Sequence, residues 1–239
     1  MDNLDKLTKL YSNLIKLINN RKDDFNEEFV SVFNYAKGSE YDNKEFDNKF
    51  LIVGRSVNGW TNYNKNELLL KEGEIINRIG NDNLQWTINN WGINYGKTYN
   101  TKRSAFWRIN RKITDLVYQV SDYNFNKLSW TNLYKISNAA GGNPSPKLQA
   151  LQFDLVKQIL IEEIRILEPK YIVFLTGYDW AKPFLIENDN IKIELLNQTN
   201  YVKAKGSFFN SKFAVGLHPQ GKLEMKHAEE ILEYLDLKN

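Results

Sequence analysis

The sequence contains no cysteine, and this absence excludes several classes of site. Without thiols the chain forms no disulfide, no thiolate zinc site and no cysteine-ligated iron–sulfur cluster. It also has only two histidines, His218 and His227, whose separation in the sequence is unlike that of a metal-ligating pair. We therefore expect neither a metal nor a cofactor.

Long hydrophobic runs are missing as well. No apolar stretch approaches the roughly 20 residues that a membrane-spanning helix needs. The first residues, MDNLDKLTKL, lack the basic end and apolar core of a signal peptide. The phosphate-binding glycine motifs and the nucleophile elbow are also absent. These absences predict a soluble, cytoplasmic protein with no membrane partner and no nucleoside triphosphate site.

The composition is that of a globular protein. Of the 239 residues, 42% are hydrophobic and 26% are charged, which is enough to build a sizeable core. The net charge of +3 permits an anionic partner without requiring one. We expect a single domain over residues 1–239, with an N-terminal helical extension over about residues 1–45, and we favour a monomer.

Helical periodicity is clear in several segments. Apolar residues recur at helical spacing over residues 4–18, which predicts a helix whose apolar stripe packs in the core or, less commonly, on a partner helix. Further helices are predicted over residues 104–120, where Ser104 is the expected N-cap, over 146–168, and over 222–237. His227 is expected on a solvent-exposed face of the last helix.

Short apolar runs between these helices predict buried strands. They end at Gly54, near Leu133, at Gly177 and at His218. Residues 61–100 are interpreted as loops around short helical pieces, and 191–209 as edge strands or a hairpin. The order predicts an α/β fold with a central, mostly parallel four-stranded sheet flanked by helices. In such folds ligands bind beyond the carboxyl ends of the strands.

One block of the sequence resembles the uracil-DNA glycosylase superfamily. The segment WTNLYKISNAAGGNPSP has a strand ending in Thr-Asn, then a lysine and an Asn/Pro loop, and a helix and the strand YIVFLTG follow. The segments VGRSVNGW and GLHPQGK correspond to the two motifs that flank the pocket in that superfamily. The resemblance covers about residues 50–222. It implies a three-layer sandwich and the removal or recognition of a uracil-like or otherwise altered base in DNA.

The resemblance assigns roles to three polar residues. Asn132 corresponds to the base-reading asparagine, whose amide can pair with the donor and acceptor of a flipped pyrimidine. His218 would stabilise the negative charge on the departing base, and Asn58 would orient water. The alternative for Asn132 is that its amide satisfies nearby backbone groups. For His218 it is that the ring only caps a strand end.

Further residues are expected to complete the site. Gly54 and Trp60 would line the base pocket, and Phe106 would stack on the base, although Phe106 also fits the apolar stripe of its helix. Three basic residues are candidates for contacts to the DNA backbone, although charged faces are usually only solvated: Lys135, Arg103 and Lys147.

The first motif departs from the superfamily. Most active members place an aspartate, glutamate or asparagine soon after its glycine, and here residues 55–58 read Arg-Ser-Val-Asn without an acid. An asparagine can orient water but cannot act as a carboxylate base. Enzymatic activity is therefore left open. The alternatives are a non-catalytic nucleic-acid-binding module and a nucleoside or nucleobase enzyme or binding protein.

Overall fold

The computed structural model describes residues 2–43, 49–57, 59–93, 99–119, 124–186 and 189–237. The chain forms two compact units, each assembled from three segments. Unit 1 comprises residues 1–36, 54–82 and 131–168, and unit 2 comprises residues 37–53, 83–130 and 169–239. Two strands, β3 (Phe50–Ser56) and β5 (Leu128–Tyr134), run from unit 2 into unit 1.

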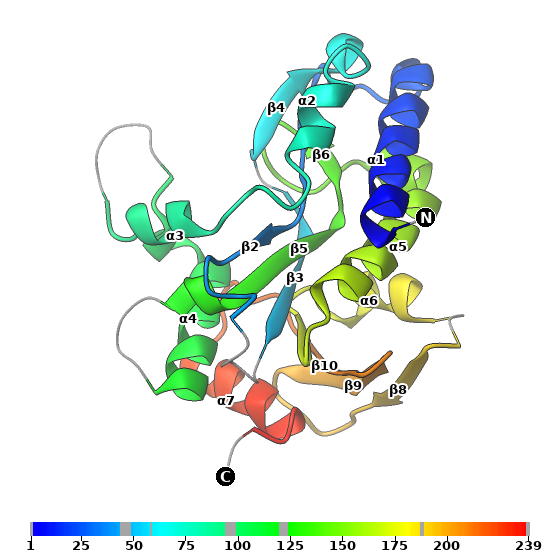
Figure 1. Ribbon diagram of the computed structural model, residues 1–239. Helices are drawn as coiled ribbons and strands as arrows, with labels where there is room; N and C mark the ends of the chain where they lie inside the picture. Colours follow the sequence, from blue (N-terminus) through cyan, green and yellow to red (C-terminus); the bar gives the residue numbers. More distant parts are fainter. Residues whose placement is uncertain are drawn as a thin grey trace. The chain divides into compact units, whose positions relative to one another are not determined.

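Two long helices form the core of unit 1. They are α1 (Asn3–Asn20) and α5 (Pro146–Leu167), which lie side by side (Figure 1). The apolar stripe of α1 is buried at Leu7, Leu10 and Leu14. Packing of this helix in the core is thus confirmed. Residues 29–37, expected within a helical extension, instead contain the strands β1 (Phe29–Val32) and β2 (Ala36–Lys37).

A serine cap and two prolines mark the ends of α5. The hydroxyl of Ser145 accepts a hydrogen bond from the backbone N–H of Leu148 at 3.4 Å, and Pro146 occupies the first helical position. At the other end Glu168 adopts a left-handed conformation (φ 44°) before Pro169. The predicted bounds of this helix are confirmed.

A small antiparallel sheet completes unit 1. In it β1 pairs with β4 (Thr61–Asn64) and with β6 (Ile136–Asn138). The interpretation of residues 61–100 as loops and short helical pieces was incomplete, because β4 is a strand. Its sequence, TNYN, has one buried residue, Tyr63, so its stability comes from pairing with β1 and not from an apolar pattern of its own. The short helices of this unit are η1 (Lys22–Asp24), η2 (Lys65–Glu67) and α2 (Glu72–Asn77).

The main sheet has seven strands in the order β2-β5-β3-β7-β10-β9-β8. The remaining bounds are β7 (Tyr171–Phe174), β8 (Ile191–Leu195), β9 (Val202–Phe208) and β10 (Ser211–Gly216). Strand β7 is parallel to β3 and β10, whereas β9 is antiparallel to both β10 and β8.

The chain has an α/β fold, but the prediction of a mostly parallel four-stranded sheet is wrong. The sheet is mixed because the β8–β9 hairpin extends it beside β10, with β9 antiparallel to both β10 and β8. No residue of β8 is buried. Antiparallel strands can leave one face to water and so need no continuous apolar run. A count of apolar runs therefore underestimates the width of this sheet.

The remaining helices of the described residues lie in unit 2. They are α3 (Gln85–Asn89), η3 (Thr101–Arg103), α4 (Ala105–Tyr118), η4 (Asn124–Lys127), α6 (Tyr178–Leu185) and α7 (Glu224–Tyr234). Ser104 caps α4 as predicted, accepting from the N–H of Trp107 at 3.4 Å. Helix α4 packs against α7 (Figure 1), where Arg108 and Glu224 form an ion pair of 2.6 Å.

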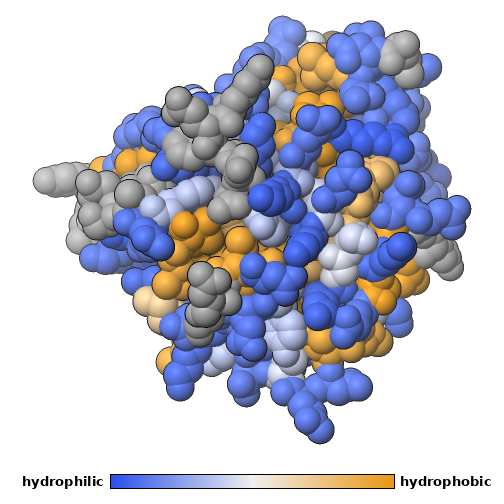
Figure 2. Space-filling view, turned by 60° about the horizontal axis from the view of Figure 1, so that its bottom comes forward, coloured by the Kyte–Doolittle hydropathy of each residue, from blue (hydrophilic) through white to orange (hydrophobic). Residues whose placement is uncertain are grey.

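The surface is mixed in polarity. Hydrophobic side chains emerge in separate patches among hydrophilic ones (Figure 2). Within the described part of the chain, every helix is too short or too polar to cross a bilayer.

Candidate functional site

The end of β5 carries the polar residues that the sequence singled out. All seven residues of this strand are buried, and alternation places Thr131 and Asn132 on opposite faces. The side-chain Nδ2 of Asn132 is buried and has no hydrogen-bond partner among the described residues. A buried amide donor without a partner costs about 1–3 kcal/mol. Because the side chain is only 1% exposed, an external acceptor would have to enter the interior of unit 1 to reach this donor.

The ammonium of Lys135 lies beside this strand end and is fully buried. Its Nζ donates to Oγ1 of Thr131 at 2.6 Å, to the main-chain oxygen of Asn132 at 2.7 Å and to Oε2 of Glu163 at 2.7 Å. An ammonium group has three donors, so each of them has an acceptor inside the protein.

Glu163, on α5, also accepts hydrogen bonds from two hydroxyl groups. Its Oε2 also accepts from the hydroxyl of Thr131 at 2.7 Å, and its Oε1 accepts from the hydroxyl of Tyr11 at 2.9 Å. Three elements that are distant in the sequence, α1, β5 and α5, are thus joined within unit 1. We call Thr131, Lys135 and Glu163 the Lys135 network.

Burial shifts the titration of two groups here. Desolvation lowers the pKa of Lys135, and the neighbouring carboxylate of Glu163 opposes that shift. The pKa of Tyr11 is raised well above its usual value, first by burial and then by the negative charge of Glu163. Tyr11 is therefore a protonated hydrogen-bond donor at neutral pH.

This geometry does not fit the expected contact of Lys135 with a DNA phosphate. The side chain is 0% exposed, and a phosphate contact would require breaking a buried ion pair. The sequence did contain a signal for this pairing. Glu163 lies four residues after the buried Ile159 on the core face of α5, and an acid at such a position requires a buried partner.

The chain leaves β5 through a turn held by side chains. The main-chain oxygen of Lys135 accepts from the N–H of Phe33 at 2.8 Å. The buried amide of Gln152 accepts from the N–H of Ile136 at 3.0 Å and donates to the oxygen of the same residue at 2.7 Å. The side-chain amide of Gln152 thus pairs with the main chain of Ile136, the first residue of β6, as a neighbouring strand would.

The other predicted residues of unit 1 lie in different settings. Gly54 is buried inside β3, which continues two residues past the predicted end, to Ser56. Trp60 is half-buried, with its Nε1 donating to Asp82 at 3.3 Å and its ring edge against Phe33. Lys147 is exposed in the first turn of α5. Asn58 lies outside the described residues.

His218 follows β10 in unit 2. The ring is partly exposed, and its Nδ1 accepts from the N–H of Gln220 at 3.4 Å. Because Nδ1 is the acceptor, the neutral imidazole carries its proton on Nε2. That is the protonation pattern of a ring able to donate a hydrogen bond.

Phe106 and Arg103 lie at the start of α4 in the same unit. Phe106 is partly exposed, and its ring is 5.2 Å from Trp107 and 6.0 Å from Trp130. Arg103 is exposed, and its main-chain oxygen accepts from Arg108 at 2.7 Å.

The expectation that His227 is solvent-exposed is wrong. The ring is fully buried on α7 and stacks on Tyr201, with 4.9 Å between the ring centroids. Neither ring nitrogen has a hydrogen-bond partner in the described part of the chain. Burial, and to a smaller extent the charge of Lys222, lowers its pKa to about 4, so the ring is neutral at neutral pH.

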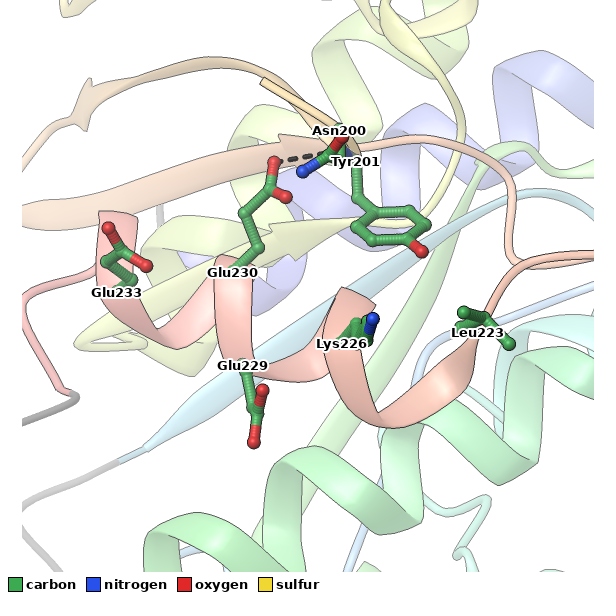
Figure 3. Close-up of a pocket in the computed structure, with 7 residues that line it drawn as sticks. All are labelled: Asn200, Tyr201, Leu223, Lys226, Glu229, Glu230 and Glu233. Carbon is green, nitrogen blue, oxygen red and sulfur yellow. Dashed lines mark hydrogen bonds between the residues drawn. The ribbon is translucent and has the colours of Figure 1, made fainter. Parts of the chain in front are cut away.

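A surface pocket of about 290 Å³ lies beside α7 (Figure 3). Glu230 points towards Tyr201, and its Oε1 accepts from the N–H groups of Tyr201 and Val202, both at 2.8 Å. The full lining is Asn200, Tyr201, Leu223, Lys226, Glu229, Glu230 and Glu233. The lining carries three carboxylates and one ammonium group, a negative balance that disfavours binding of a nucleic acid. None of the predicted site residues is part of this lining.

The described residues contain no cluster of acidic residues and histidines able to hold a metal ion.

Comparison with models of known protein families gave no match, and comparison with curated proteins gave none.

Proposed function

We propose that this protein recognises a uracil-like or otherwise altered base in DNA, and that Asn132 reads the base. The observation that carries the proposal is the side-chain amide of Asn132, which lies in the buried strand β5, two residues before its end, with its donor unpaired among the described residues. A pyrimidine carbonyl is an acceptor that would satisfy this donor, and the amide oxygen can accept from the ring N–H. The segments VGRSVNGW, WTNLYK and GLHPQGK occur in the order of the corresponding motifs of the uracil-DNA glycosylase superfamily, and this resemblance supports the same proposal.

The proposal extends to cleavage of the N-glycosidic bond. Cleavage builds positive charge on the sugar and negative charge on the departing base. His218 would donate a hydrogen bond from Nε2 to a base oxygen as the negative charge develops. The hydrogen bond that Nδ1 accepts from Gln220 supports this role, because it leaves the proton of the neutral ring on Nε2. Asn58 would orient the attacking water. Because the first motif has no acid, base recognition is better supported than catalysis.

Contacts to the DNA backbone fall to exposed basic residues. Arg103 and Lys147 are exposed and can reach a phosphate, unlike Lys135. Phe106 would stack on the base, for which its partly exposed ring is suited. The proposal includes a cytoplasmic location and a monomeric state.

The direct test uses synthetic oligonucleotides, single-stranded or mismatched in a duplex, that contain uracil, hypoxanthine or only normal bases. We expect abasic product from one of the altered bases, detected by alkaline strand cleavage. We expect the variant His218→Ala to lower the rate by about 10²–10³, the usual cost of removing one donor to a developing anion. Lys226→Ala, which removes an exposed cation of α7, is the control and should keep the wild-type rate.

Two other outcomes are informative. Binding that weakens with salt but releases no base would assign the non-catalytic role. Neither binding nor abasic product with any oligonucleotide would contradict the proposal.

A further inference from the structure

The Lys135 network is hydrogen-bonded to Asn132, the residue that we propose reads the base. Lys135 Nζ donates to the main-chain oxygen of Asn132 at 2.7 Å, three residues back along the chain. We infer that Lys135, held by Glu163 and Thr131, is a positioning residue that sets the orientation of the Asn132 amide and so the choice of base. This inference rests on the proposed function.

The bond to Asn132 is held firmly because every partner is buried. Lys135 and Glu163 have no exposed surface, so water does not compete for their bonds. The Thr131 hydroxyl accepts from Lys135 and donates to Glu163, which fixes the two charged groups relative to β5. The ammonium is thus anchored to α5 at one end and to the strand at the other.

The side chain of Asn132 needs such support from its backbone. Its Nδ2 makes no hydrogen bond to any described residue, so that donor does not help to hold the amide plane. The following residues are also anchored, since Phe33 binds the oxygen of Lys135 and Gln152 binds both polar main-chain groups of Ile136. The main chain is therefore restrained from Asn132 to Ile136, while the amide donor stays unpaired among the described residues.

A purely structural core has little reason to contain this ion pair. Apolar residues of similar volume often stabilise a protein as well as, or better than, a buried pair. A lysine is long enough to turn back and reach both a helix carboxylate and a strand carbonyl, which an apolar residue cannot bind. The hydrogen bond to Asn132 is the feature that distinguishes this pair from simple core filling.

The test compares two double variants. Lys135→Met/Glu163→Gln removes the ammonium, while the glutamine amide can still accept from Tyr11 and donate to Thr131. The matched control is Lys6→Met/Glu162→Gln, which removes the ion pair of 2.7 Å between α1 and α5, and the pair of Glu162 with Arg165, without touching Asn132. If the first variant does not fold, Thr131→Val removes the bridging hydroxyl with little change of shape.

The first measurement is base preference, taken as the ratio of the dissociation constants for single-stranded oligonucleotides that contain one uracil or one cytosine at the same position, because these two bases exchange the donor and the acceptor that an amide reads. We expect the wild type and the control variant to share one preference. In Lys135→Met/Glu163→Gln we expect this ratio of dissociation constants to fall about tenfold, which is the change expected for the loss of one hydrogen bond to a charged group.

The second measurement needs no ligand. The side-chain amide signals of Asn132 are followed by NMR in protein labelled with ¹⁵N-asparagine and assigned with Asn132→Asp. A shift or broadening of these signals in Lys135→Met/Glu163→Gln, but not in the control, supports the positioning role. Unchanged signals, or equal changes in both double variants, would overturn it. A wild type without any base preference would overturn the proposed function, while the NMR result would still decide whether Lys135 orients the amide.

Discussion

Lys135 follows a fully buried strand, and its side chain turns inward. A single lysine in a sequence indicates a solvated charge in most cases, because its burial without a partner is very costly. Here the partner is Glu163, 28 residues further along the chain, with Tyr11 behind it. The charge therefore serves the interior of unit 1 and not its surface.

The single variant Lys135→Met should be more damaging than the double variant. It leaves the carboxylate of Glu163 buried, with the hydroxyls of Tyr11 and Thr131 as its remaining donors among the described residues. We expect the free energy of unfolding to fall by about 3–5 kcal/mol, the usual cost of removing one partner of a buried pair. Adding Glu163→Gln should restore much of the loss in urea unfolding at neutral pH. An equal loss in both variants would show that the charge of Glu163 is not the cause.

At the scale of elements, the turn from β5 to β6 depends on one side chain of α5. Gln152 binds both the N–H and the carbonyl of Ile136, the first residue of β6. The turn therefore needs the amide on the helix, and the helix is positioned by its own caps at Ser145 and Glu168.

We expect Gln152→Leu to destabilise the protein by about 2–3 kcal/mol, because it leaves buried main-chain groups unpaired. Gln149→Ala, on the same helix, removes a single partly exposed bond to Pro144 and should cost less than about 1 kcal/mol. Thermal or urea unfolding of both variants checks this. A similar small loss for both would mean that water replaces the Gln152 amide.

Local signals predicted the elements better than they predicted the sheet. The bounds of α4 and α5 follow from Ser104, Ser145, Pro146 and Pro169, which act on the backbone within one turn. Strand β4 and the β8–β9 hairpin carry few buried residues, so their place in the sheets depends on partners elsewhere in the chain.

At the scale of the whole molecule, the buried ring of His227 links stability to pH. Its pKa is about 4 in the folded protein against 6.5 for an unperturbed histidine. Between these values the unfolded chain binds a proton that the folded protein does not bind. Stability should therefore fall as the pH is lowered from about 6.5 to about 4, by on the order of 3 kcal/mol.

The variant His227→Leu isolates this contribution. We expect the difference in unfolding free energy between wild type and variant to be constant above about pH 7 and to shift in favour of the variant towards about pH 4. Urea unfolding across this pH range measures it. A pH-independent difference would show that His227 does not titrate between the two states.

The candidate site was predictable in its parts. Asn132 stands out because an amide is unfriendly to a buried strand, and the structure leaves its donor unpaired among the described residues. The role of Lys135 and the burial of His227 were not predictable by the same reasoning. The first depends on Glu163 and the second on Tyr201, both far from their partners in sequence.

The sequence by itself determined the absence of thiol chemistry, the main helices with their caps, and the order of the strand-end motifs. Each of these depends on composition or on interactions within a few residues. The tertiary structure decided the mixed seven-stranded sheet, the inward turn of Lys135 and the neutral buried state of His227. These features depend on which distant segments pair and exclude water, and only the folded chain brings those segments together.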